Sequence, residues 1–329
     1  MVRTPSCCTK IHKSIAVMRI IFYIPFEGKG CDVQKGKKAM QLYLWENQTA
    51  FRAVATLLGV LGIALGTVTP TSADVINCGD VLGPGGRFQL EQDLTCPFSA
   101  LTIRDGAILD LHGHRVTCTP PSAGFRCVVL TGKEAQLRNG TVAGGLHESI
   151  TLEGTGGHTV RDVTSSLVDA NILVTSDHNR LINVIAQSVY NAAFAIYGDH
   201  NRLTNSMALC PFVALDGCIS IAGDENDLSD NLVSVEEDCC APGVGRGGMR
   251  IAGHKNRLRL NRVTNHDGPG IVVLGTDNDL RFNTALGNVL DLQDMNGDCT
   301  HNTWKHNIFD TSDPPCIGAG VAKVTLMAK

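Results

Sequence analysis

Acidic and basic side chains gather in a short stretch of the chain that begins at Glu236. Glu237 and Asp238 follow directly, and Arg246 lies eight residues beyond Asp238. A pair of carboxyl groups can supply a general acid and a general base, and a guanidinium group can bind a carboxylate. Such a set would suit the cleavage or modification of an acidic sugar chain.

Three other stretches of the chain carry side chains of the same kinds. We assign Glu237, Asp238, Arg246, His266 and Asp267 to a candidate catalytic group, and Tyr190, Asp216 and Glu236 to a candidate substrate-binding group. These residues can act together only if the fold brings four separate stretches to one side of the molecule. The elements between them must therefore be regular.

A repeat runs through this region and predicts such regularity. Five asparagines mark it at spacings of 22, 25, 30 and 22 residues, and each is followed two residues later by a leucine. Apolar residues lie five and seven positions before each asparagine, and a small apolar residue lies seven positions after it. The asparagines are Asn179, Asn201, Asn226, Asn256 and Asn278. A looser form of the pattern surrounds Ile108, Val128, Val160 and Trp304.

Apolar residues two positions apart are typical of strands that bury one face. Short strands that recur every 22 to 30 residues predict a single-stranded right-handed parallel β-helix of roughly 8–9 coils, an all-β solenoid. A leucine-rich repeat would need Leu-x-x-Leu-x-Leu, and a helical solenoid would need stretches of 3.6-residue periodicity; neither is present. Insertions at one phase of a solenoid project from one side, so the candidate residues should converge there.

The turn that precedes each strand reads Gly-x-x-Asn, with Ser176 in place of the first glycine. Glycine and asparagine both tolerate left-handed backbone angles, and we attribute their presence to that property. Asparagine side chains that stack from coil to coil can also hydrogen-bond to one another. The sequence therefore predicts an asparagine ladder.

Three columns of charged residues flank the asparagines. His178 and His200 share a column with Glu225, Lys255 and Asp277, which we interpret as a solvated ladder, with a metal site as the alternative. Asp177, Asp199, Asp224 and His254 form a column that we interpret as turn caps, with a Ca²⁺ site as the alternative. The last column, Arg180, Arg202, Asp227, Arg257 and Asp279, should relieve like-charge stacking by alternating its signs. No other metal or cofactor site is identifiable.

The N-terminal part of the chain has the pattern of an export signal. The apolar stretch from Ala53 to Val68 follows Arg52 and ends in small residues at Ala73, and it is too short for a stable membrane helix. We therefore divide the chain into an extension outside the mature protein (1–51), a signal peptide (52–73), an N-terminal cap (74–100), the β-helix (101–316) and a tail (317–329). A cytoplasmic tail with a membrane tether is the alternative. The mature chain should be secreted, periplasmic or at the cell surface, without a transmembrane helix.

The cysteine count agrees with export. Three of the 13 cysteines precede residue 74, and the even number that remains indicates disulfides rather than zinc ligands. The ten are Cys78, Cys96, Cys118, Cys127, Cys210, Cys218, Cys239, Cys240, Cys299 and Cys316. Closeness in sequence pairs Cys78 with Cys96, Cys118 with Cys127 and Cys299 with Cys316. The other four could pair as Cys210–Cys218 with the rest left over, or across loops.

Charge argues against a nucleic-acid partner. The whole chain has a formal net charge of −4, and it contains no run of basic residues that could follow a phosphate backbone. The sequence makes no prediction of the oligomeric state.

The two ends of the repeat resemble a known superfamily. The stretches from Asn77 to Cys96 and from Ile108 to His114 are similar to the first coils of secreted bacterial right-handed parallel β-helix proteins, and the stretch from Asn302 to Phe309 is similar to their last. This superfamily includes pectate lyases, polygalacturonases, alginate epimerases and periplasmic copper-maturation proteins. The resemblance covers about residues 76–316 and implies the β-helix fold, with Trp304 and Phe309 closing its C-terminal end.

Activity follows less directly from the resemblance. The Asp-Pro-His-Asp of the epimerases is absent, and so are the Asn-Thr-Asp, Gly-His-Gly and Arg-Ile-Lys motifs of the polygalacturonases. Two functions are expected on this scaffold. The first is binding of an extracellular polysaccharide, with cleavage or modification by a lyase, hydrolase or epimerase reaction; the second is a non-catalytic envelope or surface protein that binds or spaces its partner.

Overall fold

The computed structural model describes residues 75–119, 125–144, 148–168, 170–188, 192–210, 217–235 and 247–318. Within these residues every element is a β-strand except one short 3-10 helix, η1 (Pro315–Gly318). No helix among them is long and apolar enough to cross a membrane. The N-terminal extension, the signal peptide, the tail from residue 319 onward, Cys239, Cys240 and six candidate site residues lie outside the described residues; the six are Tyr190, Asp216, Glu236, Glu237, Asp238 and Arg246.

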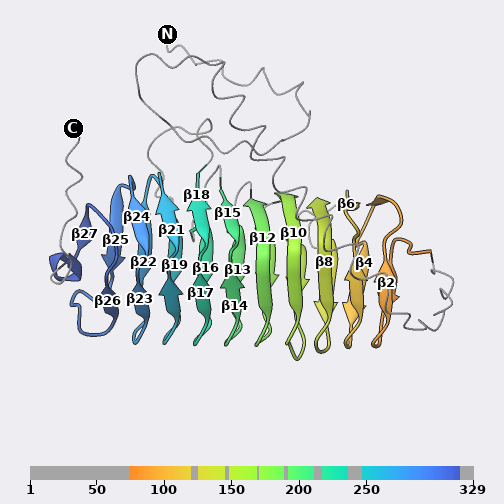
Figure 1. Cartoon of the computed structure of the whole chain (residues 1–329), viewed down its shortest axis with the longest axis horizontal. Coiled ribbons are helices and arrows are strands. Elements are labelled where there is room, and N and C mark those ends of the chain that lie inside the picture. The colour runs from red at the N-terminus through yellow and green to blue at the C-terminus, as the bar shows by residue number, and fades with distance from the viewer. Residues whose placement is uncertain are drawn as a thin grey trace, which may run out of the picture. The chain divides into compact units, whose positions relative to one another are not determined.

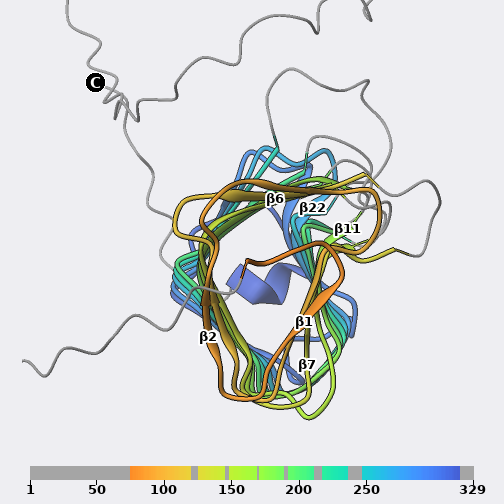
Figure 2. The same ribbon diagram turned by 90° about the vertical axis from the view of Figure 1, so that its right-hand side faces the viewer.

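The strands wind into a right-handed parallel β-helix of about nine turns, which confirms the predicted fold (Figures 1 and 2). Each coil contributes one strand to sheet A, and all pairings in this sheet are parallel. In order along the axis the strands are β1 (Asp80–Leu82), β4 (Leu101–Arg104), β7 (Val128–Thr131), β9 (Glu148–Leu152), β11 (Ala170–Val174), β13 (Phe194–Ile196), β16 (Ile219–Ile221), β19 (Met249–Ile251), β22 (Pro269–Val273), β25 (Leu290–Asp294) and β27 (Ser312–Asp313).

Sheet B forms the rest of each coil and bends into two parts. The part that follows sheet A contains β2 (Arg87–Gln89), β5 (Ile108–Asp110), β14 (Arg202–Thr204), β17 (Asp227–Ser229), β20 (Arg257–Arg259), β23 (Asp279–Arg281) and β26 (Thr303–Lys305). The second part contains β3 (Leu94–Cys96), β6 (Arg115–Cys118), β15 (Met207–Leu209), β18 (Leu232–Ser234), β21 (Arg262–Thr264) and β24 (Thr284–Leu286). Three long strands run through both parts: β8 (Gln136–Gly144), β10 (Thr159–Val168) and β12 (Arg180–Ser188).

The predicted apolar columns line the interior. Leu181, Leu203 and Leu228 lie in register on successive coils and are at most 1% exposed, and the columns of sheet A are buried to the same degree. Phe194 is among the largest fully buried side chains. Because the side chains of a strand alternate between its two faces, the residues between these columns point to solvent.

The predicted asparagine ladder is present. The backbone N–H of Asn179 donates to Oδ1 of Asn201 at 2.8 Å, and the same bond joins Asn201 to Asn226, Asn226 to Asn256 and Asn256 to Asn278. The ladder begins at a residue that the sequence pattern missed. The N–H of buried His158 donates to Oδ1 of Asn179.

A second ladder, not predicted, lies at the bend of sheet B. Its members each accept the backbone N–H of the residue one coil earlier, and they are Ser206, Asn231, Asn261, Asn283 and Asn307. They recur five residues after the first ladder, so the signal was present in the sequence. Each ladder satisfies backbone groups in the interior of a turn, where no strand partner is available.

The structure corrects the role assigned to Gly-x-x-Asn. The left-handed residue is the one directly before each asparagine, for example His200 at φ 55° and Lys255 at φ 54°, and not the glycine or the asparagine itself. The glycines are needed because the coils approach closely here. A Cβ on Gly253 would overlap the carbonyl oxygen of Gly223, one coil earlier.

Four disulfides are formed within the described residues. They are Cys78–Cys96, Cys118–Cys127 and Cys299–Cys316, as predicted, and Cys210–Cys218, which the sequence left open. All four join residues at most 18 positions apart. Each therefore fastens a local turn rather than tying distant coils together.

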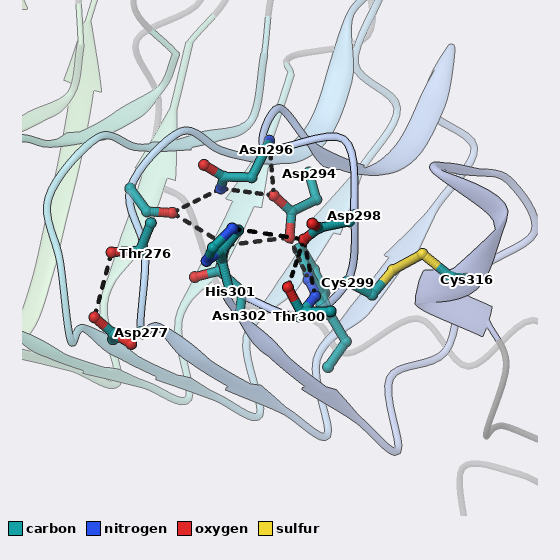
Figure 3. Close-up of polar contacts among 12 residues, drawn as sticks. Thr276, Asp277, Asp294, Asn296, Asp298, Cys299, Thr300, His301, Asn302 and Cys316 are labelled. Carbon is teal, nitrogen blue, oxygen red and sulfur yellow. Dashed lines mark hydrogen bonds and ion pairs between the residues drawn. A yellow bond between two sulfur atoms is a disulfide. The ribbon is translucent and has the colours of Figure 1, made fainter.

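The C-terminal end is closed by buried polar groups (Figure 3). Both oxygens of Asp294, which is 3% exposed, accept hydrogen bonds: Oδ1 from Asn296, and Oδ2 from the amide of Asn302 and the indole N–H of Trp304. Asn302 is the last member of the first ladder. The disulfide Cys299–Cys316 and η1 lie next to it, and Trp304 and Phe309 pack against the core, as the resemblance implied.

Candidate functional site

The longest connections between described strands, among them β18–β19 and β15–β16, fall at the same corner, between sheet B and the next strand of sheet A. Fourteen residues separate β18 from β19, whereas two separate β17 from β18. The candidate residues follow the same rule: Tyr190 precedes β13, Asp216 precedes β16, Glu236–Arg246 precede β19, and His266 and Asp267 precede β22. In chain order, all four stretches therefore follow a strand of sheet B and precede one of sheet A.

Of the eight candidates, His266 and Asp267 are described. Asp267 is exposed, whereas His266 is only 2% exposed. The backbone N–H of His266 donates to Oδ1 of Asn288, which occupies the equivalent position one coil later. Burial lowers the pKa of His266 to about 4, against the raising effects of the Val233 carbonyl and the Asp267 carboxylate. This imidazole is neutral near pH 7 and lies within the corner rather than on the surface.

The surface beside this corner is the outer face of sheet A. Tyr197 follows β13 directly and is 56% exposed. Thr175 and Ala222 occupy its position in the two adjacent coils, and Ala195 precedes it on the same face. These neighbours are small, so the phenol ring stands clear of them.

Charged groups lie on either side of Tyr197 along sheet A. Two coils earlier, Glu153 forms an ion pair with Arg126, which also lies 4.0 Å from Glu148. Two coils later, the side chain of Arg250 lies in register between Ser220 and Val272 on the outer face and has no ion-pair partner among the described residues. At about 4.8 Å per coil, Glu153 to Arg250 spans roughly 20 Å along the axis.

Tyr197 and Arg250 were missed by the sequence analysis because it followed the buried columns. Each lies one position from such a column: Tyr197 follows Ile196, and Arg250 precedes Ile251. In a strand with one buried face, that offset means an outward side chain. An outward tyrosine or arginine among small residues was the available signal.

The aspartate column has a structural role. Oδ1 of Asp177 accepts the N–H of Asp199, Asp199 accepts that of Asp224, and Asp224 accepts that of His254. This confirms the turn-cap interpretation. The rings of His178 and His200 lie 4.9 Å apart. Among the described residues no group of three or more His, Cys, Asp or Glu side chains is arranged to hold a metal ion.

A cavity of about 670 Å³ opens at the C-terminal end. It is lined by Trp304, Lys305 and His306 of the last coil and by the Cys299–Cys316 disulfide with Ile317. The polar atoms of Asn302 and Trp304 that could have faced a ligand are bonded to Asp294 instead. The cavity belongs to the end closure rather than to the insertion corner.

Comparison with known proteins finds no close relative. No protein-family model and no curated protein matches the chain. The Dettilon tailspike protein (gp208) is 12% identical, with a TM-score of 0.44 over 69% of this chain and 54% of that chain. The DFA-IIIase from Arthrobacter chlorophenolicus A6, solved without its lid, is 17% identical, with a TM-score of 0.47 over 72% of this chain and 65% of that one.

The shared feature is the β-helix. This chain spans about half of the tailspike chain and just under two thirds of the DFA-IIIase. At such identities neither likeness assigns an activity to this protein.

Proposed function

We propose that this protein is an exported β-helix that binds a polysaccharide across the outer face of sheet A. The observation that supports the proposal is the placement of Tyr197. An exposed aromatic ring with small neighbours stands on the outer face of sheet A, whose strands follow the longest insertions.

Tyr197 offers what a sugar ring requires. Its apolar face can pack against the C–H groups of a sugar, and its hydroxyl can hydrogen-bond, so one side chain serves both kinds of contact. Arg250 lies two coils away and can donate to hydroxyl or carboxylate oxygens. The distance of roughly 20 Å along this face suits a chain of several sugar units rather than one.

Export is part of the proposal. Disulfides persist in oxidising compartments, and four are formed within the described residues. We place the mature protein outside the cytoplasm, as a secreted, periplasmic or surface protein.

Catalysis, where it occurs, we assign to the insertion that contains Glu236, Glu237, Asp238 and Arg246. These side chains follow β18, at the corner adjacent to the proposed binding face. A wild-type protein that releases reducing ends or unsaturated products from a glycan would be an enzyme, and Asp238→Ala should then abolish release while binding persists. Binding without any product would assign the protein to the non-catalytic class.

The first prediction concerns Tyr197. We expect Tyr197→Ala to weaken binding to the glycan that the wild type selects from a panel of laminarin, xylan and polygalacturonate by tenfold or more, because an aromatic contact of this kind is worth about 1–3 kcal/mol. Isothermal titration calorimetry measures the change.

Phe282→Ala is the matched control. Phe282 is similarly exposed, at 51%, but lies at the bend of sheet B and stacks on His306. Its removal should leave the affinity unchanged. Equal losses in the two variants, or wild-type binding to none of the three glycans, would refute the proposed face.

A further inference from the structure

A second surface, on sheet B, carries two arginines that the fold leaves without partners. Arg180 of β12 and Arg202 of β14 are directly in register on adjacent coils, and both are exposed. Stacked strands lie about 4.8 Å apart, and like charges directly opposite each other destabilise a sheet. Neither guanidinium group forms an ion pair with any described residue.

Several other arginines of this face pair with acids. Arg138 bonds Asp110 at 3.0 Å, and both Arg259 and Arg281 pair with Asp279. We expected Asp279 to balance the arginines of its own column, which runs from Arg180 to Asp279. Instead it pairs with arginines of the neighbouring column.

Arg257 lies in register between Asp227 and Asp279. Arg180, in contrast, lies in register between Thr159 and Arg202, so it has no acidic neighbour in its column. Arg202 has one, Asp227, on its far side. The excess of positive charge is therefore confined to two coils.

Histidines lie beside the same two coils. His178 and His200 stand two residues before Arg180 and Arg202, with φ of 58° and 55°, and their rings are 4.9 Å apart. Nδ1 of His200 lies 3.4 Å from the carboxylate of Glu225, and this carboxylate also lies 3.7 Å from Nζ of Lys255. His178 remains available as a hydrogen-bond donor next to Arg180.

We propose that Arg180 and Arg202, with His178 beside them, form a second binding site that takes an anionic group of an acidic glycan, a carboxylate or a sulfate. An anion held between the two guanidinium groups removes their mutual repulsion and accepts charge-assisted hydrogen bonds from both. The restriction to two coils limits the site to one or two acidic units.

The site is separate from the face that contains Tyr197. Sheet A and the first part of sheet B form opposite sides of each coil, as the positions of β1, β7 and β2 in Figure 2 show. Among the described residues, no exposed Phe, Tyr or Trp side chain accompanies the arginines in these two coils of sheet B, and a net charge of −4 opposes a nucleic acid. Both facts favour a glycan over a nucleic acid, whose bases would stack on aromatic rings.

The test compares two double variants that remove the same charge. Arg180→Gln/Arg202→Gln breaks the proposed site, whereas Arg87→Gln/Lys305→Gln removes two exposed cations from strands β2 and β26 at the ends of the same sheet. The probes are polygalacturonate for the carboxylate, dextran sulfate for the sulfate, neutral dextran and a single-stranded DNA oligonucleotide. Affinities are measured by calorimetry at low and physiological ionic strength.

We expect the first double variant to bind the preferred polyanion at least tenfold more weakly and the second to lose less than threefold. The melting temperature of the first should not fall, because a repulsive pair has been removed. Equal losses in the two double variants would mean that general electrostatic attraction, and not a site, binds the polyanion. The proposal would also be overturned if the wild type bound neither polyanion, or bound DNA more tightly. Tyr197→Ala should retain this binding, which separates failure here from failure of the sheet A proposal.

Discussion

His266 illustrates how position changes the meaning of a residue. Its type and its place in an insertion stretch suggest an acid or a base, yet it occupies the corner position that Asn288 takes in the next coil. Its folded pKa of about 4 lies below the ordinary value of 6.5, because burial disfavours the charged form. The residue is built into the fold.

This burial predicts acid sensitivity. Between pH 6.5 and about 4 the unfolded chain binds a proton that folded His266 does not, so its contribution is complete above pH 6.5 and is lost as the pH falls toward 4. The loss should be on the order of 3 kcal/mol. We expect His266→Asn, which copies Asn288, to flatten this part of the stability profile, measured by urea unfolding at several pH values.

The control for this prediction is internal. His158, whose pKa burial also lowers, is present in both proteins and contributes equally to both profiles. Its Nδ1 accepts the N–H of Ala135, and its Nε2 faces the carbonyl of Glu153, so it too folds as a neutral ring. Identical pH profiles for the wild type and the variant would contradict the assignment to His266.

At the level of elements, the ladders decide where each turn lies. A turn between two strands leaves backbone N–H groups without partners, and here an asparagine side chain from the next coil accepts them. Because each acceptor serves a donor one coil earlier, the ladder also fixes the register of neighbouring coils. Burial in a close-packed interior then excludes water from these bonds.

Removal of one acceptor should therefore cost more than one average hydrogen bond. Asn256→Ala leaves the buried N–H of Asn226 without a partner, and we expect a loss of about 2 kcal/mol in the free energy of unfolding. Asn256→Ser should lose less, because Ser206 already performs this role in the second ladder. Equal losses from alanine and serine, in chemical unfolding curves, would show that the acceptor is unimportant.

The sequence predicts this level well where the signal is periodic. The leucine and asparagine columns recur in five coils, and the strands, their order and the first ladder follow from them. The reason for the glycines could not be predicted, because the approach of Gly253 to the Gly223 carbonyl depends on how the coils stack. The burial of His266 could not be predicted either, because the sequence alone does not show which residues of an insertion project outward and which form the corner of the coil.

The candidate site was predicted from the position of its residues within each repeat, and not from contacts between them. In chain order all eight residues fall between a strand of sheet B and the next strand of sheet A, and their convergence on one surface stays a prediction. Tyr197 and Arg250 emerge only once outward positions are assigned. Their partners on neighbouring coils are 22 to 30 residues distant, which is beyond the reach of any local motif.

For the whole molecule, contacts run only between adjacent coils, so stability should be lost from the ends. The Cys299–Cys316 disulfide fastens η1 to the last coil. We expect Cys299→Ser/Cys316→Ser to cost about 2–4 kcal/mol and to speed hydrogen exchange first in β26 and β25, with β10 and β12 protected as before. Cys78→Ser/Cys96→Ser should produce the mirror-image pattern at β1 to β3. Uniform exchange across all coils would contradict this view.

The two ends of the first ladder also bear on how such a chain can change its length. At one end the N–H of Ala135 donates to His158, and at the other Asn302 donates to Asp294, which also accepts the indole N–H of Trp304. Duplication of either terminus would bury an end group among the wrong neighbours. Duplication of a middle segment such as 201–225 would copy a donor together with its acceptor, so longer or shorter forms of this protein can arise only by gain or loss from within.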